Sequence, residues 1–485
     1  MRVYISATLR NYFGKNHVIE TAEDNIRSVL KFLTDEYPDA KQILFDEDEK
    51  IRSFIRIYVG SDDHTASDMW YKKLAEEDEI LILPAIAGGA PSDSIINDKR
   101  MKAQTLDDND IKRFEKHLLL KEISVKGQKR IKAARVVVCG AGSLGSSVIQ
   151  YIAAAGVGTI KVVDDKDVAL ADVSSQVLHS SRDVNRPKVA SAKDKVRNIN
   201  KNIEFEAESV KLDSENIEEI FDGYDLVIDC TDNYKARYLI NDACALLDIP
   251  LVFASIYQYE GRVGIFNHNG GPCLRCVYPE PPVPGLVPTC AEGGTISPLA
   301  GIVGSIQANE ALKLIIGIGD HLDGKLLTVD SLYLNSRILN VKKNSKCPLC
   351  GLSKTIVSVE DFDYEEFCGL KESDNEVPVE GITPEELTRR MDNNDPMTII
   401  DVREPHERAI MRFPNAIIIP IGQLARRMKE LNPEVDTIFI CKSGRRSILA
   451  INTLREAGYE GPMYNLKGGI DAMKDIVFSH EGAWL

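Results

Sequence analysis

The sequence lacks several features that mark membrane proteins and nucleic-acid-binding proteins. None of its apolar runs reaches the roughly 18 residues of a membrane-spanning helix. Its first residues, "MRVYISATLRNYF", have no continuous apolar core such as a signal peptide carries. Basic residues are also not in excess, since 59 Lys and Arg stand against 74 Asp and Glu, for a net charge of −15. Because duplex-binding proteins normally present a basic face, we expect a cytoplasmic protein that binds neither a membrane nor nucleic acid.

Cysteine is present in a pattern that does not indicate a disulfide framework. Four of the ten cysteines form two CxxC pairs, which favours metal or redox chemistry in a reducing cytosol. The length of 485 residues gives room for about three domains. The fractions of apolar residues (44%) and charged residues (27%) are ordinary for a globular protein.

Two polar stretches divide the chain into three blocks. Residues 1–89 predict a small sheet packed on one helix, and residues 90–109 read as a linker. Residues 110–352 alternate apolar β-rich runs with helical stretches, which predicts a mostly parallel, doubly wound sheet. An acidic linker, 353–378, leads to residues 379–485, which alternate in the same way. The expected fold class is therefore α/β, with several domains.

A glycine-rich turn opens the second block. In "VVVCGAGSLGSS", Gly140, Gly142 and Gly145 lie after a strand and before a helix. Glycines let the backbone approach phosphates closely, and the helix N-terminus supplies N–H donors. Alone, this turn indicates no more than a bound nucleotide, with a dinucleotide as the usual ligand.

The charged residues that follow favour ATP with Mg²⁺. Asp164 ends a strand in "VVDDKD", a place where a carboxylate holds ribose hydroxyls. Lys188 in "RPKVA" and Asp232 in "DCTDNYKAR" suit a triphosphate and its metal ion. Phosphoryl chemistry depends on neutralising that charge.

Two CxxC pairs predict a structural Zn²⁺ site. Each tight turn presents two thiolates, so four can surround one tetrahedral ion. Four protein ligands leave no open position for catalysis. The ligands expected are Cys273, Cys276, Cys347 and Cys350.

A further cysteine has the surroundings of a reactive thiol. In "FICKSGRRS", Cys441 follows an apolar strand and precedes a loop that opens a helix, with Arg445 and Arg446 nearby. Loop amides, a helix N-terminus and arginines all favour a thiolate. With "DVREPHE" and "LKGGI", the third block resembles a rhodanese, which carries a persulfide on this cysteine. Dual-specificity phosphatases share such a loop, but they need arginine six positions after the cysteine, where this chain has Ser447.

The second block resembles the adenylyltransferases of the MoeB and ThiF type, which activate sulfur carriers and are relatives of ubiquitin-activating enzymes. The likeness rests on "GAGSLGS", "LHSSRDVNRPKVASA", "DCTDNYKARYLIN" and "PTCAEGG". It implies that the glycines cradle ATP, Asp164 holds the ribose, Lys188 touches phosphates and Asp232 holds Mg²⁺. It also implies a homodimer. It further implies that Cys290, on a mobile loop, attacks an acyl disulfide or forms one with the carrier.

The block departs from that family at three positions. Asp172 and Ser175, in "DVSSQ", stand where the family has asparagine and arginine, and Lys116, in "RFEKH", stands for another arginine. Losing a guanidinium loses a bidentate phosphate clamp, and an added carboxylate repels phosphate. We hypothesise that Arg182 and Arg186 compensate; the alternative is a weakened or inactive adenylation site.

The first block resembles the small carrier subunit of molybdopterin synthase, a ubiquitin-like β-grasp protein of the MoaD and ThiS type. "VYISATLRNYFG" and "ILILPAIAGG" carry the likeness. Such carriers react through the carboxylate of their last glycine, but here Gly88 and Gly89 continue into the chain. A processing protease that cuts between Gly89 and Ala90 would release that carboxylate; an uncut tail would instead act as an inhibitor or docking element.

Taken together, these resemblances imply ATP-dependent adenylation of a carrier's Gly-Gly terminus, followed by persulfide transfer that yields a thiocarboxylate. The carrier is the chain's own first block or a separate protein, and a cysteine desulfurase would be a suitable persulfide donor. Two alternatives remain open. One is a scaffold that keeps the rhodanese transfer but has lost adenylation, and the other is activation of a ubiquitin-like modifier for conjugation to proteins. The resemblance implies that the sulfur serves molybdopterin synthesis or a related pathway.

Overall fold

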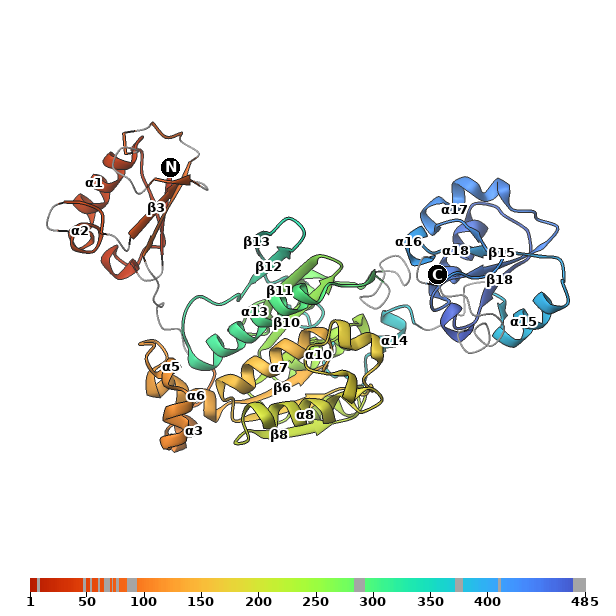
Figure 1. The fold of residues 1–485 in the computed structure, drawn as a ribbon, viewed down its shortest axis with the longest axis horizontal. Coiled ribbons are helices and arrows are strands. Elements are labelled where there is room, and N and C mark those ends of the chain that lie inside the picture. The colour runs from red at the N-terminus through yellow and green to blue at the C-terminus, as the bar shows by residue number, and fades with distance from the viewer. Residues whose placement is uncertain are drawn as a thin grey trace.

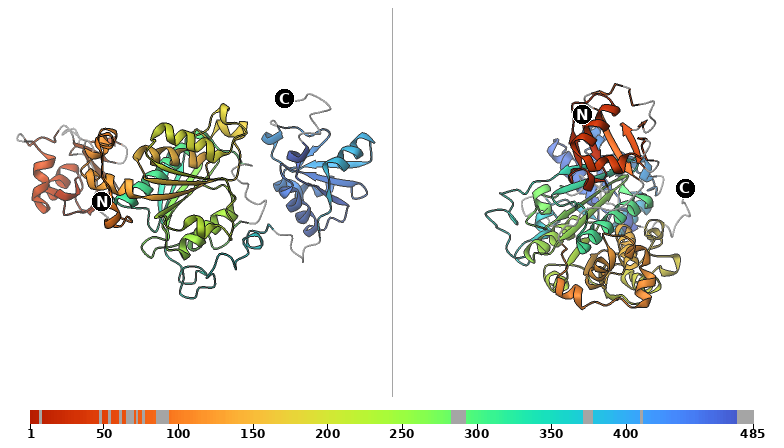
Figure 2. Two further views of the ribbon diagram at one scale, coloured as in Figure 1. Left: turned by 90° about the horizontal axis from the view of Figure 1, so that it is seen from below. Right: turned by 90° about the vertical axis from the view of Figure 1, so that its left-hand side faces the viewer.

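Three sheets, each with its own core, follow one another along the chain in the computed structural model (Figures 1 and 2). The structure describes residues 1–6, 9–46, 49–52, 55–59, 62–64, 70–71, 73–75, 78–84, 94–282, 293–370, 378–408 and 411–473.

The first sheet has five strands in the order β2-β1-β5-β3-β4, with a parallel central pair β1 and β5 and antiparallel neighbours. The predicted helix is α1, and Asn25 caps it by accepting the Ser28 N–H at 2.9 Å. Its apolar face, including Val29 and Leu33, packs on the sheet. The elements are β1 (Arg2–Ile5), β2 (Val18–Glu20), α1 (Ile26–Glu36), α2 (Pro38–Leu44), β3 (Ile55–Val59), β4 (Asp62–Asp63) and β5 (Glu79–Pro84).

The second sheet has eight strands in the order β13-β12-β11-β10-β9-β6-β7-β8. The five strands from β10 to β8 are parallel, as the alternation predicts, and β11, β12 and β13 extend the sheet in antiparallel fashion. The strands are β6 (Arg135–Cys139), β7 (Thr159–Val163), β8 (Glu204–Glu208), β9 (Leu226–Asp229), β10 (Leu251–Tyr257), β11 (Glu260–Phe266), β12 (Lys325–Asp330) and β13 (Asn335–Asn340).

Helices cover both faces of this sheet, and each face has a hydrophobic core. The chain leaves β6 toward β7 and β8 and then returns to β9 on the other side of β6, so the carboxyl ends of β6 and β9 form a topological switch point, where ligands bind in such folds. The helices are α3 (Asp98–Ala103), α4 (Asp108–Arg113), α5 (Glu115–Leu118), α6 (Ser124–Ala133), α7 (Ser143–Ala155), α8 (Lys188–Ile199), α9 (Ile217–Phe221), α10 (Tyr234–Leu246), α11 (Leu274–Val277), α13 (Ser297–Ile316) and α14 (Tyr364–Phe367).

Helix α13 is, within the described residues, the one helix with the length and apolar composition to cross a membrane. It packs against α7, β10 and β11, and residues such as Val303, Ala311 and Leu314 are fully buried in the core. Helix α13 is therefore a core helix of this domain.

The two expected linkers differ from the structure, because parts of both pack onto the second domain. In the first, Ile96 and Met101 are buried in its core, and the Ser94 hydroxyl donates to the Ile315 carbonyl. In the second, Val359 and Tyr364 are buried in the core on the other face. The domain therefore extends from about residue 94 to residue 370.

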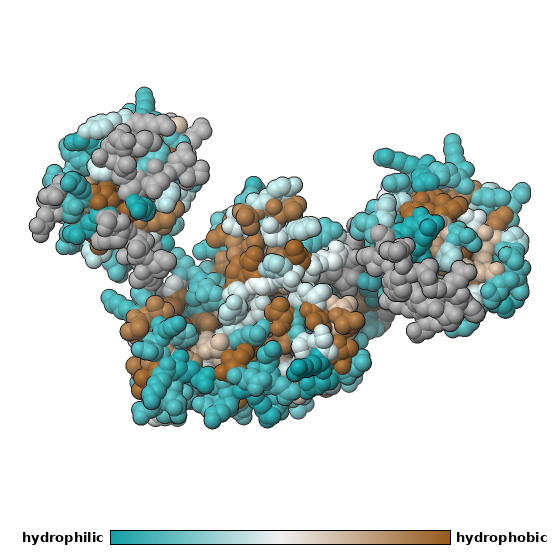
Figure 3. Space-filling model, viewed as in Figure 1, coloured by the Kyte–Doolittle hydropathy of each residue, from teal (hydrophilic) through white to brown (hydrophobic). Residues whose placement is uncertain are grey.

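An apolar surface marks the hairpin of β12 and β13 on this domain. Its exposed side chains are visible as a brown region in Figure 3. Contiguous apolar surface of this kind is typical of protein-binding sites. The exposed residues are Leu332, Tyr333, Leu334, Ile338 and Leu339.

The third sheet has five parallel strands in the order β14-β18-β17-β15-β16, with a core on each face. Its elements are β14 (Gly381–Ile382), α15 (Pro384–Asp392), β15 (Met397–Asp401), α16 (Pro405–Arg408), β16 (Ile417–Ile418), α17 (Ile421–Arg427), β17 (Asp436–Ile440), α18 (Arg445–Glu456) and β18 (Met463–Leu466).

Candidate active sites

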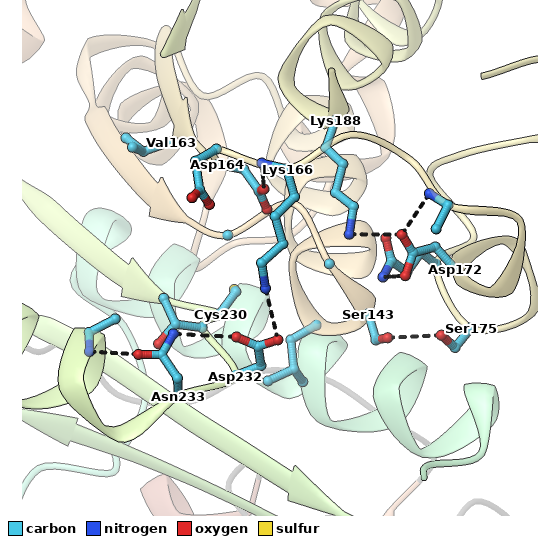
Figure 4. A pocket seen from close by; sticks show the side chains of 18 of the residues that line it. Ser143, Val163, Asp164, Lys166, Asp172, Ser175, Lys188, Cys230, Asp232 and Asn233 are labelled. Carbon is cyan, nitrogen blue, oxygen red and sulfur yellow. Dashed lines mark hydrogen bonds and ion pairs between the residues drawn. The ribbon is translucent and has the colours of Figure 1, made fainter. Parts of the chain in front are cut away.

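A cavity of about 820 Å³ opens at the switch point of the second sheet (Figure 4). It brings together four residues predicted for the nucleotide site that are far apart in the sequence: Gly142, Asp164, Lys188 and Asp232. Gly140 also lines it. Gly145 does not, but a Cβ there would lie 2.0 Å from the Gly140 carbonyl oxygen, so the third glycine is needed for the turn itself.

Asp164 and Asp232 are held by different partners at this edge. Asp164 accepts the backbone N–H groups of Ala141 at 2.8 Å and Lys166 at 2.9 Å, which ties it to the glycine turn. Asp232 lies 3.3 Å from the Lys166 ammonium. Burial raises the pKa of Asp232, but the Lys166 charge and the hydrogen bonds from Asn233 and Lys166 together outweigh it, and the pKa is lowered. Asp232 is therefore an anion at neutral pH, as a metal ligand must be.

Asp172 does not stand unpaired in the cavity. Its carboxylate lies 3.0 Å from the Lys188 ammonium and accepts a hydrogen bond from the Gln176 amide at 2.8 Å. Ser175, at the other departure from the family pattern, lies 3.1 Å from the Ser143 hydroxyl. Lys188 thus offsets the repulsion expected of Asp172, but a phosphate has to compete with Asp172 for this lysine.

The hypothesis that Arg182 and Arg186 compensate for the missing arginines is wrong. Neither is among the described residues that line the cavity. Arg186 forms ion pairs with Asp183 at 2.8 Å and with Asp194 at 2.6 Å instead. Lys116 is exposed on α5 and does not line the cavity either.

Other cations line the cavity and were missed in the sequence. Two of them lie in "DNYKAR", directly after Asp232, at the start of α10. Their closeness in sequence to Asp232 was the signal that could have placed them in the nucleotide site. The Arg237 guanidinium donates to the Thr231 carbonyl at 2.9 Å. The cavity's additional cations are Lys166, Lys211, Lys235 and Arg237.

A second cavity, of about 600 Å³, adjoins the first and shares Asp232, Arg237 and Ile256 with it. Tyrosines and prolines contribute much of its lining, among them Tyr257 and Tyr278. It is therefore a less polar recess that ends at the residue predicted to hold Mg²⁺.

The four cysteines predicted to bind zinc lie together. The distance between sulfur atoms is 3.5 Å for Cys273 and Cys347, 3.3 Å for Cys276 and Cys350, and 3.9 Å for Cys273 and Cys276. Sulfurs around a tetrahedral zinc are separated by about 3.8 Å. The group joins α11 to the segment after β13, so a metal here would tie the end of the domain to its body.

Cys441 lies at the end of β17, at the start of the loop that leads to α18. The Gly444 N–H donates to its sulfur at 3.1 Å, and Gly444 has a φ of +90°, which aims that N–H into the loop. Gly469, in "LKGGI", closes the loop from the other side, because a Cβ there would lie 2.4 Å from the Lys442 carbonyl oxygen. The Gly444 amide thus donates to this sulfur, a contact that favours a thiolate.

Arg446 is paired with a carboxylate. It binds the Glu407 carboxylate in bidentate fashion, at 2.7 and 2.8 Å, and both side chains are almost buried. The expected contribution of this arginine to the thiolate is therefore offset by Glu407. The pair instead fixes the start of α18 to α16.

Three predicted site residues lie outside the described residues: Cys290, Gly88 and Gly89. Their predicted roles stay predictions.

Comparisons with known proteins match two families along the chain. Residues 114–349 match the ThiF family, and residues 383–475 match the rhodanese-like domain. The chain is 38% identical over 378 residues to "Probable adenylyltransferase/sulfurtransferase MoeZ" of Mycobacterium tuberculosis, covering 76% of this chain and 94% of that protein. It is 35% identical over 383 residues to "Adenylyltransferase and sulfurtransferase MOCS3" of Aedes aegypti, covering 76% and 87%.

A third relative matches the second domain. "Sulfur carrier protein adenylyltransferase" of Thermus thermophilus is 45% identical over 267 residues, which is 54% of this chain and 98% of that protein. The chain therefore belongs to the family of adenylyltransferase/sulfurtransferases in which a ThiF domain is followed by a rhodanese-like domain.

Proposed function

We propose that this enzyme adenylates the C-terminal Gly-Gly of a ubiquitin-like sulfur carrier with ATP and then converts it to a thiocarboxylate. The observation that carries the proposal is the cavity at the switch point, which gathers a glycine turn, Asp164, Lys188 and Asp232. A rhodanese loop in the same chain supplies a sulfur carrier residue, Cys441.

In the adenylation step, Gly140 and Gly142 let the backbone approach the phosphates, and Asp164 holds the ribose. Mg²⁺, held by Asp232, would neutralise phosphate charge. The carrier's terminal carboxylate oxygen attacks the α-phosphorus, the bond to the pyrophosphate breaks, and an acyl adenylate forms. The second cavity, which reaches Asp232 from its less polar side, suits an extended Gly-Gly tail.

In the sulfur step, the terminal sulfur of a persulfide on Cys441 attacks the acyl carbon and AMP leaves. The product is an acyl disulfide with Cys441. The Cys290 thiolate then attacks the Cys441 sulfur, so that the carrier leaves as a thiocarboxylate and the two cysteines form a disulfide. A dithiol reductant restores both thiols, and a cysteine desulfurase is a suitable source of the persulfide.

The first domain is the carrier in this proposal. Its strand order, β2-β1-β5-β3-β4 with a parallel central pair and α1 packed on the sheet, supports the assignment of a β-grasp fold. Gly88 and Gly89 follow β5 within a few residues in the sequence, as the reactive tail of such a carrier does. A protease that cuts between Gly89 and Ala90 would release the carboxylate. We assign residues 1–89 to the carrier and residues 379–485 to the rhodanese domain.

The remaining assignments follow the family. The four clustered thiols suit a structural Zn²⁺. A homodimer of the second domain would bring ATP sites close to the interface, and the apolar β12–β13 hairpin supports contact with a protein partner. Free thiols, including the buried Cys139 and Cys244, suit a reducing cytosol.

The test is exchange of labelled pyrophosphate into ATP by the full chain, supplied with residues 1–89 as a separate protein ending in Gly89. We expect exchange that needs both this carrier and Mg²⁺, and that is lost in Asp232→Asn. Absence of exchange at every carrier concentration would contradict adenylation.

A scaffold without adenylation is the second candidate, and the pairing of Asp172 with Lys188 favours it, together with serine at position 175. It predicts sulfur transfer from Cys441 with no pyrophosphate exchange. The same experiment therefore separates the two.

A further inference from the structure

A second group of metal-binding side chains lies in the ThiF domain, apart from the four cysteines. His268 follows β11, and His321 and Asp323 lie in the loop between α13 and β12. One ligand atom from each lies within 4.8 Å of the others. The group shares no residue with the cavities or with the four thiols.

Both imidazoles converge on one carboxylate oxygen. Nδ1 of His268 lies 2.8 Å, and Nδ1 of His321 lies 3.7 Å, from Oδ2 of Asp323. Both histidine side chains are more than nine-tenths buried. The other oxygen of Asp323 is buried and has no hydrogen-bond partner among the described residues. Two imidazoles and a buried carboxylate thus meet at one place.

The 2.8 Å separation has the length of a hydrogen bond, whereas the 3.7 Å separation is too long for one. Ligand atoms of a tetrahedral zinc with nitrogen and oxygen donors lie about 3.3 Å apart, and the two observed distances bracket that value. Imidazole with carboxylate is a donor set that suits zinc and similar divalent ions. Three protein ligands also leave one position open.

The backbone around the group is held in place independently of the histidines. The Leu322 N–H donates to Glu310 on α13 at 3.0 Å, and the Leu322 carbonyl accepts from Ile265 of β11 at 3.3 Å. The turn after His268 is closed by the Gly271 N–H, which donates to the His268 carbonyl at 2.8 Å. The three ligands are therefore preorganised on elements that are packed together.

We propose that His268, His321 and Asp323 bind one divalent transition-metal ion of the zinc class through both Nδ1 atoms and the carboxylate. The ion replaces the proton between His268 and Asp323 and clamps the turn after β11 to the end of α13. This turn leads into the first CxxC pair, so the second ion steadies the segment that supplies half of the four-cysteine site.

The test is a titration of the full chain, its four-cysteine site already filled with zinc, with Co²⁺. We expect one further equivalent to bind with the weak visible bands of a nitrogen and oxygen site and without a sulfur-to-cobalt charge-transfer band. Affinity should fall at least tenfold in His321→Gln and in Asp323→Asn. His17→Gln, at an exposed histidine of the first domain, should bind as the unaltered chain does.

Asp323→Asn keeps an oxygen that can accept a hydrogen bond from His268, so we expect this variant to stay folded. If His321→Gln lowers the circular dichroism of the folded chain, the metal affinity of Asp323→Asn is the deciding measurement. Failure to bind the further equivalent would overturn the proposal. So would equal affinity in Asp323→Asn, or a charge-transfer band that places the ion on a thiolate.

Discussion

Lys188 is held by a carboxylate before any anion reaches it. The 3.0 Å pair with Asp172 is nearly buried on the lysine side, with 6% of that side chain exposed. A phosphate that binds Lys188 must weaken this pair, and Asp172 then stays behind as a nearby negative charge. The substitution of asparagine by aspartate is therefore expected to weaken ATP binding rather than to destabilise the cavity.

Asp172→Asn should therefore improve ATP binding. The amide oxygen still accepts a hydrogen bond from Gln176, but Lys188 no longer has an anionic partner and is available to a phosphate. We expect the KM for ATP in pyrophosphate exchange to fall by roughly tenfold, equivalent to about 1.4 kcal/mol. Asp194→Asn, which removes an ion-pair partner of Arg186 outside the cavity, is the control and should leave the KM unchanged. An unchanged or higher KM in Asp172→Asn would show that the pair does not compete with ATP.

Glu407 and Arg446 form the corresponding pair in the rhodanese domain, and here the pair stabilises the fold. Burial raises the pKa of Glu407, but Arg446 and the Glu404 N–H outweigh it, so the pKa is lowered. As the pH falls, Glu407 therefore takes up a proton in the unfolded chain before it does so in the folded chain. The stabilisation is complete above the ordinary glutamate pKa of about 4.3 and is lost as the pH falls through the lower folded value.

Glu407→Gln should lower the stability of this domain by about 3 kcal/mol at neutral pH, because it removes the carboxylate that binds the buried Arg446 guanidinium. Hydrogen exchange of the β17 and α18 amides in the full chain measures the change. The loss of protection as the pH is lowered should also become shallower in this variant. Glu430→Gln breaks the exposed pair with Arg427 and should leave protection nearly unchanged, because solvent screens exposed ion pairs. Equal effects of the two variants would contradict a stabilising role for the buried pair.

At the scale of elements, the Cys441 loop depends on a neighbour that is distant in the sequence. The turn after β18 carries Gly469, whose position against Lys442 and Cys441 leaves no room for a side chain. The Ile470 N–H also donates to the Cys441 carbonyl at 2.8 Å. The loop is therefore shaped from two sides, by α18 and by this turn.

Gly469→Ala should displace the loop and lower sulfur transfer from thiosulfate to cyanide by about 100-fold, since small misplacements of reacting groups cost that much. Gly458→Ala is the matched control, because Gly458 also has a positive φ, +86°, but no atom within 4 Å of its Cβ position. Both variants carry the same kind of backbone strain, but only the first should lose activity. A similar loss in both would attribute the effect to strain alone.

Across the whole molecule, the features that could be predicted from the sequence are those that depend on local residue patterns, such as strands and the residues at their ends. The apolar runs that end at Gly140, Asp164 and Asp232 indicated parallel strands whose carboxyl ends meet, and the structure places these residues around one cavity. The pairing of Asp172 with Lys188 was not predictable, because a short helical turn and α8 bring the two together. The linkers were misjudged because their few apolar residues, such as Ile96 and Val359, lie among many charged ones.

The order of the three domains makes a prediction about processing. A thiocarboxylate needs a free carboxyl group, and in the intact chain the Gly89 carbonyl is an amide. Sulfur transfer to the first domain therefore requires a cut after Gly89. Chain purified from its own host should contain a free protein of residues 1–89, part of it heavier by the exchange of one oxygen for sulfur in its intact mass.

Gly89→Pro should block this cut, since proline before the scissile bond resists most proteases, and the fused chain should then carry no thiocarboxylate. Ser92→Pro places a proline in the same segment and should still be cut. A fused Gly89→Pro chain that carried the sulfur would refute the requirement. If the unaltered chain stays uncut yet forms thiocarboxylate on a separately supplied carrier, the first domain is no substrate, and its Gly-Gly tail serves as an inhibitor or docking element of the activation site.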